Sequence, residues 1–527
     1  MMKRLLAAVV VVMMAVVGAV GTFGDNLKAL FGMSADCLAG DTVVARRTGK
    51  LERKKLTSFA VDDGAYAAPV VSAPSPNPEV RTALDSRSTF AIDVDTASYT
   101  FARRLVLEQR ALPPPGDVRV EEWVNAFDYR LAPPTAAPFA VSVEGATSPF
   151  DEARTLLKVS LKGRVVADVD RQPAHLVFLV DVSGSMAGAD RLPLAKRALA
   201  VLTRQLTPRD TVALVTYAGS TEVVLPPTPV TAANRTTILR AIDALDAGGG
   251  TAMGSGMELA YRLAVRQVAP RTTTRVVVLT DGDTNIGPNL TPDAMLDAVH
   301  AHVEEGVTLT TVGFGLGNYR GNALERLADK GNGQALYVDG EAAIERVFHR
   351  QLTGTLEVIA KDAKVQVTFD PKVVSSYRLL GYENRAVADE DFRNDAVDGG
   401  ELGAGHAVTA LYEVTLTSQA GALGTVAVRG LVPGTGQAFE VEQPISRAAV
   451  AHALPELGAD FRFAAAVALG ADTLRGNELG AWPLGAIAEL AEGAADERPE
   501  RLEFVALLRR AAELRAGQGV ALRQGAW

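Results

Sequence analysis

The chain has 527 residues, more than a single hydrophobic core organises, so we expect about three or four domains. Apolar residues make up 48% of it, which is enough to fill large cores. Its net charge of −9 argues against the broad basic surface of a nucleic-acid-binding protein, so no nucleic-acid partner is expected. A single cysteine, Cys37, excludes an intramolecular disulfide and a cysteine-based metal cage.

The first residues have the pattern of an export segment. Lys3 and Arg4 precede an uncharged run from Leu5 to Gly24. A basic start followed by an apolar stretch is typical of a signal peptide, but this run is also long enough to span a bilayer. Residues 1–24 are therefore predicted to be a signal peptide or a membrane anchor, and both alternatives stay open. In either case we expect the rest of the chain to be exported, to the periplasm or cell envelope.

A linker and a small mixed module follow. Residues 25–86 are predicted to be a disordered linker, because Gly64 to Ser86 is rich in alanine, proline and serine. Residues 87–170 are predicted to combine helices and strands. The expected segments are the strand Thr89–Asp95, the helices Ala97–Gln109 and Val120–Phe127, and the strands Phe139–Glu144 and Leu156–Leu161.

Asp93, Asp95 and Ser98 lie at the junction between the first strand and helix of this module. Their spacing superficially resembles a metal site. Capping of the helix through Asp95 or Thr96 explains the same residues, because short polar side chains are preferred there. We favour this structural interpretation.

Residues 171–354 alternate strands with helices. Four mainly apolar runs suit parallel strands covered on both faces, namely Leu176–Val180, Val212–Val215, Val276–Leu279 and Leu309–Phe314. Helical periodicity marks Leu194–Gln205, Ala233–Leu245, Met253–Val268, Pro292–Glu305 and Asn322–Ala328. This alternation predicts a doubly wound, Rossmann-like α/β domain.

Strand patterns return after this domain. Residues 355–447 are predicted to be β-rich, with strands at Lys364–Phe369, Ala407–Leu416, Thr425–Val432 and Ala438–Gln443. Residues 448–527 are predicted to be a helical segment, with helices at Phe461–Leu474, Leu484–Leu490 and Leu502–Leu514. The two ends of an α/β domain often lie close together. We therefore expect it to be inserted in one sandwich-like β domain built from strands on both sides.

Oxygen-bearing side chains follow the strand ends of the α/β domain. Asp181, Ser183 and Ser185 come directly after one apolar run, Asp281 follows another, and Thr251 follows three glycines. In open α/β sheets, ligands bind beyond the carboxyl ends of the strands. Hard cations prefer oxygen donors. These five residues predict a divalent-metal site, with Mg²⁺ expected and Mn²⁺ or Ca²⁺ as alternatives, and with one coordination position open to a partner.

The combination of Asp181-x-Ser183-x-Ser185, Thr251 and Thr280-Asp281-Gly282 resembles the metal-ion-dependent adhesion site of von Willebrand factor type A domains. The resemblance implies that the serines and the threonine bind the metal, and that the two aspartates help directly or through water.

The flanks, Phe90–Tyr99 and Gly381–Arg385, resemble the N-terminal module and the C-terminal domain of unknown function in bacterial YfbK-like von Willebrand factor type A proteins. That resemblance implies an exported or lipid-anchored protein. Asp36 before Cys37 does not fit a lipoprotein cleavage box, so no lipid anchor is expected there.

The functional expectation is binding, not catalysis. The sequence has no His-Glu-x-x-His motif, no Gly-x-Ser-x-Gly elbow and no phosphate-binding loop. We expect a cell-envelope protein that binds a divalent cation and, through it, an Asp or Glu carboxylate of a protein partner, with membrane contact through the N-terminal segment if that is uncleaved. Two alternatives stay open: a metal-assisted hydrolase, for which Asp283 is the extra acid, and a metal-stabilised scaffold of the envelope.

Overall fold

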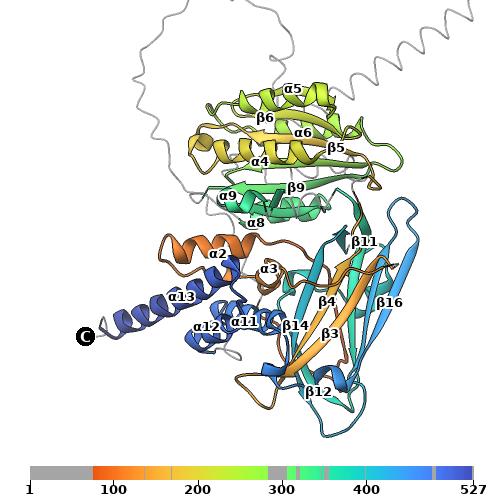
Figure 1. Ribbon diagram of the computed structural model, residues 1–527, viewed down its shortest axis with the longest axis vertical. Helices are drawn as coiled ribbons and strands as arrows, with labels where there is room; N and C mark the ends of the chain where they lie inside the picture. The colour runs from red at the N-terminus through yellow and green to blue at the C-terminus, as the bar shows by residue number, and fades with distance from the viewer. Residues whose placement is uncertain are drawn as a thin grey trace, which may run out of the picture. The chain divides into compact units, whose positions relative to one another are not determined.

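The computed structural model describes residues 75–135, 137–167, 169–282, 305–315, 321–345, 347–348, 354, 356–397, 399–476 and 482–524. In this part of the chain the strands form three sheets, and helices cover the sheet of the α/β domain (Figure 1). Short 3-10 helices occur at η2 (Pro115–Asp117), η3 (Gly184–Ala187), η5 (Glu383–Arg385), η6 (Asp389–Arg393), η7 (Arg447–Val450) and η8 (Leu454–Glu456).

The α/β domain is built on a sheet of order β10-β9-β8-β5-β6-β7. Its strands are β5 (Ala174–Asp181), β6 (Thr211–Tyr217), β7 (Thr221–Pro229), β8 (Thr273–Thr280), β9 (Val307–Phe314) and β10 (Gln334–Val338). Helices α4 (Leu192–Gln205), α5 (Ala232–Asp243) and α9 (Glu341–Ile344) share a core with one face, and α6 (Met253–Val265) and α8 (Gly321–Lys330) with the other. The predicted doubly wound fold is confirmed.

The sequence pattern does not predict two strands of this sheet. β7 is an antiparallel edge strand with three prolines and only one buried residue, Leu225, so it shows no continuous apolar run. β10 is fully buried but has only five residues. The sheet is therefore mixed at one edge. The predicted helix Pro292–Glu305 lies, but for its last residue, outside the described residues.

The β-rich region consists of two sheets around a common core. One has the order β1-β12-β14-β4-β3, and in the other β2 pairs with β11 of β13-β11-β15-β16. The bounds are β1 (Val80–Arg81), β2 (Arg87–Ala91), β3 (Phe139–Thr147), β4 (Thr155–Gly163), β11 (Val358–Phe369), β12 (Val374–Leu380), β13 (Gly400–Gly403), β14 (Ala407–Leu416), β15 (Gly424–Leu431) and β16 (Ala438–Ile445). Strands from before and after the α/β domain share each sheet, which confirms the insertion.

The end of the predicted linker is ordered, contrary to expectation. β1 pairs with β12, and the side-chain amide of Asn77 donates to the carbonyls of Leu379 (3.2 Å) and Gly381 (2.7 Å). The residues that hold this segment lie about 300 positions later in the sequence, so no local sequence pattern predicts these contacts. The predicted signal peptide or anchor and the rest of the linker lie outside the described residues. Among the helices that the structure describes, none is long and apolar enough to cross a membrane.

The C-terminal helices share a core with the N-terminal module. α11 (Ala459–Leu474), α12 (Leu484–Glu492) and α13 (Pro499–Gln524) pack with α2 (Ala97–Leu107) and α3 (Val120–Asn125). Tyr99, Trp123, Phe127 and Phe504 meet there with ring centroids 4.9–6.4 Å apart. Because aromatic rings bury large areas, this cluster joins the two ends of the described chain in one core.

Candidate metal centre

The candidate site begins with Asp181, the last residue of β5. Because β5 runs parallel to both β6 and β8, the carboxyl ends of the three strands meet at one edge. The Asp181 carboxylate is fully buried, and its Oδ2 accepts hydrogen bonds from the hydroxyls of Thr280 (2.9 Å) and Tyr217 (3.2 Å). Its Oδ1 accepts from the backbone N–H of Ser183 (2.9 Å). Donors from the ends of β6 and β8 and from the turn after β5 therefore hold this carboxylate in one orientation.

The two serines lie together on the turn that follows β5. Ser183 Oγ and Ser185 Oγ are 3.0 Å apart. Adjacent ligands of an octahedral Mg²⁺, each about 2.1 Å from the ion, are about 3.0 Å from each other. The observed separation of the hydroxyls therefore fits two neighbouring positions of one small divalent cation.

The loop that carries Thr251 is held against the serine turn by backbone hydrogen bonds. The N–H of Gly248 donates to the carbonyl of Val182 (2.7 Å), and the N–H of Gly184 donates to the carbonyl of Gly249 (3.1 Å). Gly249 has a φ of +85°, a conformation that side-chain-bearing residues rarely adopt. Thr251 follows two residues later, partly buried, just before α6. The structure thus brings the threonine loop beside the serines.

Asp281 is joined to the serine turn through an arginine. The guanidinium of Arg191 donates from Nη1 to Asp281 Oδ2 (2.8 Å) and to the backbone carbonyl of Ser185. The Asp281 side chain is 1% exposed and that of Arg191 is 20% exposed. Arg191 therefore partly neutralises one of the two carboxylates. The sequence analysis did not identify Arg191. Its position at the N-terminus of α4 is a signal of a nearby acidic partner, because the helix dipole disfavours an isolated cation there.

The electrostatics of the site favour a cation. Burial raises the pKa of Asp181, hydrogen bonds from Ser183 and Thr280 oppose this, and the charge of Asp281 raises the pKa further. Burial, together with the charge of Asp181, also raises the pKa of Tyr217, which keeps its hydroxyl protonated as a donor. A divalent ion would relieve the repulsion between the two aspartates.

The donor set consists of hydroxyls and two carboxylates. Within the described ranges, no three His, Cys, Asp or Glu side chains gather to hold a metal, so a site here needs the hydroxyl oxygens. That composition suits a hard cation and excludes a zinc site of thiolates and imidazoles. The residues present fit Mg²⁺. Asp283, the extra acid considered for hydrolysis, lies outside the described residues.

Asp93 and Asp95 have a role other than capping. Thr96 is the N-cap of α2 but makes no side-chain capping hydrogen bond there, so the predicted capping through Thr96 is wrong. Asp95 Oδ1 instead accepts the backbone N–H of Ala335 in β10 (2.9 Å). Arg385 donates to Asp93 Oδ2 (3.0 Å) and to Asp95 Oδ2 (3.4 Å). The pair joins the N-terminal module to the α/β domain and to the β domain.

Comparison with known families covers most of the chain. Residues 175–350 match the von Willebrand factor type A domain, and residues 72–158 match a family described as von Willebrand factor. Residues 354–424 and 417–514 match the family described as uncharacterized protein YfbK, C-terminal.

Individual proteins show the same resemblance. The uncharacterized protein YfbK of Escherichia coli (strain K12) is 37% identical over 466 residues, which cover 82% of this chain and 79% of that protein. The magnesium-chelatase 60 kDa subunit of Rhodobacter capsulatus is 36% identical over 141 residues, 26% of this chain and 24% of that subunit. The match to a solved von Willebrand factor type A structure from Catenulispora acidiphila covers 71% of this chain and 89% of the solved chain, with 19% identity and a TM-score of 0.45. This chain belongs to the YfbK-like family of von Willebrand factor type A domain proteins.

Proposed function

We propose that this protein binds a divalent cation, Mg²⁺ in the first place, through Asp181, Ser183, Ser185, Thr251 and Asp281, and that the cation holds an Asp or Glu carboxylate of a protein partner. The observation that carries the proposal is the pair of serine hydroxyls 3.0 Å apart beside two buried carboxylates. Family membership supports it, because von Willebrand factor type A domains serve metal-dependent protein interactions in general.

The residues of the proposed site have different roles in binding the cation. Ser183, Ser185 and Thr251 offer oxygen donors without adding negative charge. Asp181 is oriented by Tyr217 and Thr280, and part of the charge of Asp281 is offset by Arg191. A bound cation would supply an electrophilic position for an anionic ligand. Since the protein contributes so little net negative charge, that position favours a carboxylate from outside.

The location of this binding is proposed from the N-terminal sequence. The basic start and the apolar run of residues 5–24 support export to the periplasm or cell envelope, with the segment either cleaved or retained as an anchor. Mass determination of the mature N-terminus, together with fractionation of the native host, would separate the two forms. Recovery of the intact chain only from the cytosol would contradict export.

Calorimetric titration of the full chain with Mg²⁺, Mn²⁺ and Ca²⁺ tests the metal site. Replacing both Ser183 and Ser185 by alanine should weaken Mg²⁺ binding by about tenfold or more, because two of the direct ligands are lost. Ser375→Ala, which removes an exposed hydroxyl from β12, is the matched control and should leave the affinity unchanged. A double serine variant that binds Mg²⁺ as the unmodified chain does would show that the ion lies elsewhere.

Partner binding is tested by pull-down from an envelope fraction. The unmodified chain should retain a protein with Mg²⁺ present, and EDTA or Asp181→Ala should release it. Metal binding should also raise the melting temperature, since a ligand of the folded state stabilises it. Equal recovery of the partner under all these conditions would contradict a metal-bridged contact while leaving a structural role for the metal.

A further inference from the structure

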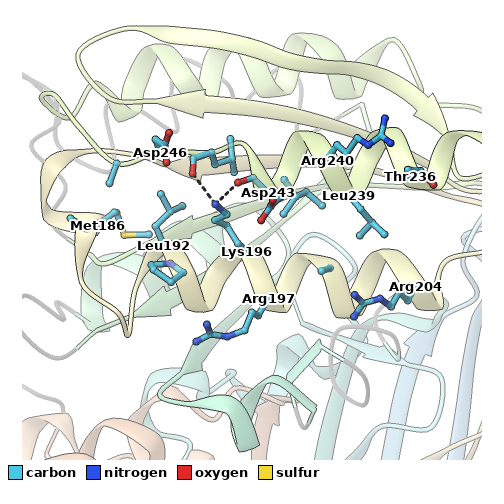
Figure 2. A pocket seen from close by; sticks show the side chains of 16 residues that line it. Met186, Leu192, Lys196, Arg197, Arg204, Thr236, Leu239, Arg240, Asp243 and Asp246 are labelled. Atoms are coloured by element: carbon cyan, nitrogen blue, oxygen red, sulfur yellow. Dashed lines mark hydrogen bonds between the residues drawn. The ribbon is translucent and has the colours of Figure 1, made fainter.

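A groove of about 910 Å³ lies between α4 and α5. It begins at Met186 and Ala187, the two residues that follow the metal-site serine Ser185. Figure 2 shows Met186 and Leu192 at one end of the groove and Arg204 and Arg240 at the other. The groove therefore runs from the metal site along the length of α4.

The floor of the groove is apolar. Leu192 on α4 and Ile242 on α5 are almost fully buried, and Pro193 and Leu239 lie beside them, partly exposed. Because these side chains belong to two helices fixed on the same face of the sheet, the floor is part of the folded core. Apolar side chains of a bound segment would find a preformed surface there.

The rim carries charged residues of both signs. Asp246 lies toward the Met186 end, Asp243 and Lys196 lie midway, and Arg204 and Arg240 lie at the far end (Figure 2). The other two cations of the rim are already engaged. Lys196 donates from Nζ to the carbonyl of Leu245 (3.0 Å) and to that of Asp243. Arg197 forms an ion pair with Glu341.

Arg204 and Arg240 remain as binding groups. Both are exposed, and neither guanidinium has an ion pair within the described part of the chain. An arginine offers a planar fork of donors that matches a carboxylate. Figure 2 shows Arg204 on α4 and Arg240 on α5, on opposite sides of the groove. Each guanidinium therefore offers a separate position for an anion at the end of the groove away from Met186.

We propose that the groove between α4 and α5 binds an extended segment of the protein partner that carries an acidic side chain at each end of an apolar stretch. This deepens the proposed function and rests on it: one carboxylate reaches the metal, and the other pairs with a guanidinium at the far end of the groove, that of Arg204 on α4 or that of Arg240 on α5. α4 has 14 residues and is therefore about 21 Å long. An extended chain covers that length in about six residues. The partner segment thus has two carboxylates about six or more residues apart.

A phage-displayed library of random peptides, selected on the full chain in Mg²⁺, tests this surface with segments of every composition. Enriched peptides should carry two acidic positions separated by about six residues of mainly apolar sequence. A selected peptide, labelled for fluorescence anisotropy, is then measured against variants. Arg204→Glu with Arg240→Glu should weaken it by about tenfold or more, because like charges then face each other.

Two controls isolate the distal contact. Arg266→Glu, at the end of α6 on the opposite face of the sheet, should leave the affinity unchanged. A peptide with its distal acid replaced by glutamine should bind more weakly and should no longer respond to the reversal at Arg204 and Arg240. Circular dichroism and melting temperature verify that each variant is folded.

The outcomes separate this proposal from the metal site. If EDTA abolishes peptide binding but charge reversal has no effect, the groove is not used and this inference is wrong. If EDTA has no effect, the metal bridge is wrong, whereas a response to charge reversal would still support the groove. If the unmodified chain enriches no peptide above the level seen with a variant altered at Asp181, Arg204 and Arg240, both the metal bridge and the groove proposal are wrong. A dimer in light scattering that disappears on charge reversal would assign the groove to a second copy and overturn the choice of partner.

Discussion

At the scale of single residues, the site depends on how each carboxylate is held. Asp181 accepts three hydrogen bonds from three different strands or turns, and this fixes its position before any ligand arrives. Asp281 is paired with a cation of the chain itself, Arg191. The two acids are thus unequal, and if the site binds a metal as proposed, this difference predicts that Arg191 lowers its metal affinity.

Arg191→Gln should strengthen Mg²⁺ binding by about three- to tenfold at low salt, because the guanidinium repels the incoming cation and competes with it for the carboxylate of Asp281. In the metal-free protein the same change should lower the melting temperature, since a buried carboxylate loses an ion pair. Calorimetry and thermal unfolding measure the two effects. Arg197→Gln, on the exposed face of α4, is the control and should alter neither. Weaker metal binding in Arg191→Gln would show that the arginine mainly positions Asp281.

At the scale of elements, Asp210 fixes the start of the α/β sheet. Its carboxylate is fully buried, forms an ion pair with Arg171, and accepts the backbone N–H groups of Ala174 (2.8 Å) and Thr207 (2.6 Å). Burial alone would raise the pKa of Asp210, but these hydrogen bonds and the charge of Arg171 outweigh it and lower the pKa. One side chain therefore joins the beginnings of β5 and β6.

Asp210→Asn should destabilise the α/β domain at neutral pH by about 3 kcal/mol, because it leaves the buried guanidinium of Arg171 without its ion-pair partner. A carboxylate whose folded-state pKa is lowered stabilises the fold above its unfolded pKa and loses this effect as pH falls through the folded-state value. The difference between variant and unmodified chain should therefore shrink below about pH 4. Denaturant unfolding at neutral and acid pH measures it, with exposed Asp170→Asn as control. A difference that does not depend on pH would contradict the role of the ionised carboxylate.

At the scale of the whole molecule, the inserted α/β domain is bound to its flanks by polar contacts. Asp95 accepts the backbone N–H of Ala335 in β10, Arg103 forms an ion pair with Asp339, and Arg119 forms one with Glu325 (2.8 Å). In each pair, one residue precedes the α/β domain and the other lies within its last third. Such contacts can couple the stability of the inserted domain to that of the surrounding domain.

Asp95→Ala should weaken this coupling. The N–H of Ala335 and the guanidinium of Arg385 both lose an acceptor, and a buried group left without a partner costs about 1–3 kcal/mol. We expect scanning calorimetry to show a lower first transition and a wider separation between the unfolding of the α/β domain and that of the rest. Glu152→Ala, at an exposed position between β3 and β4, should leave the trace unchanged. An unaltered trace in Asp95→Ala would show that the domains unfold independently of this contact.

Local sequence was sufficient to predict the central strands and the oxygen-bearing residues at their ends. β5, β6, β8 and β9 are buried on both faces, so each leaves a largely apolar run, interrupted in β9 by Thr310 and Thr311, and oxygen-bearing residues directly follow the runs of β5 and β8. Both are properties of short stretches of the chain. The order of the motifs along the chain then sufficed to predict that Asp181, Ser183, Ser185 and Asp281 lie at the same edge of one sheet.

Only the folded structure shows which residues far apart in the sequence contact each other. Arg191 and Asp281 are 90 residues apart in sequence, and Asp95 and Ala335 are 240 apart. The edge strands β7 and β10 exist because a neighbouring strand offers hydrogen bonds, and the ordered segment around β1 exists because β12 does. The charged groove likewise requires α4 and α5 to lie side by side. Pairing across such separations depends on all parts of the fold at once, and no local periodicity carries that information.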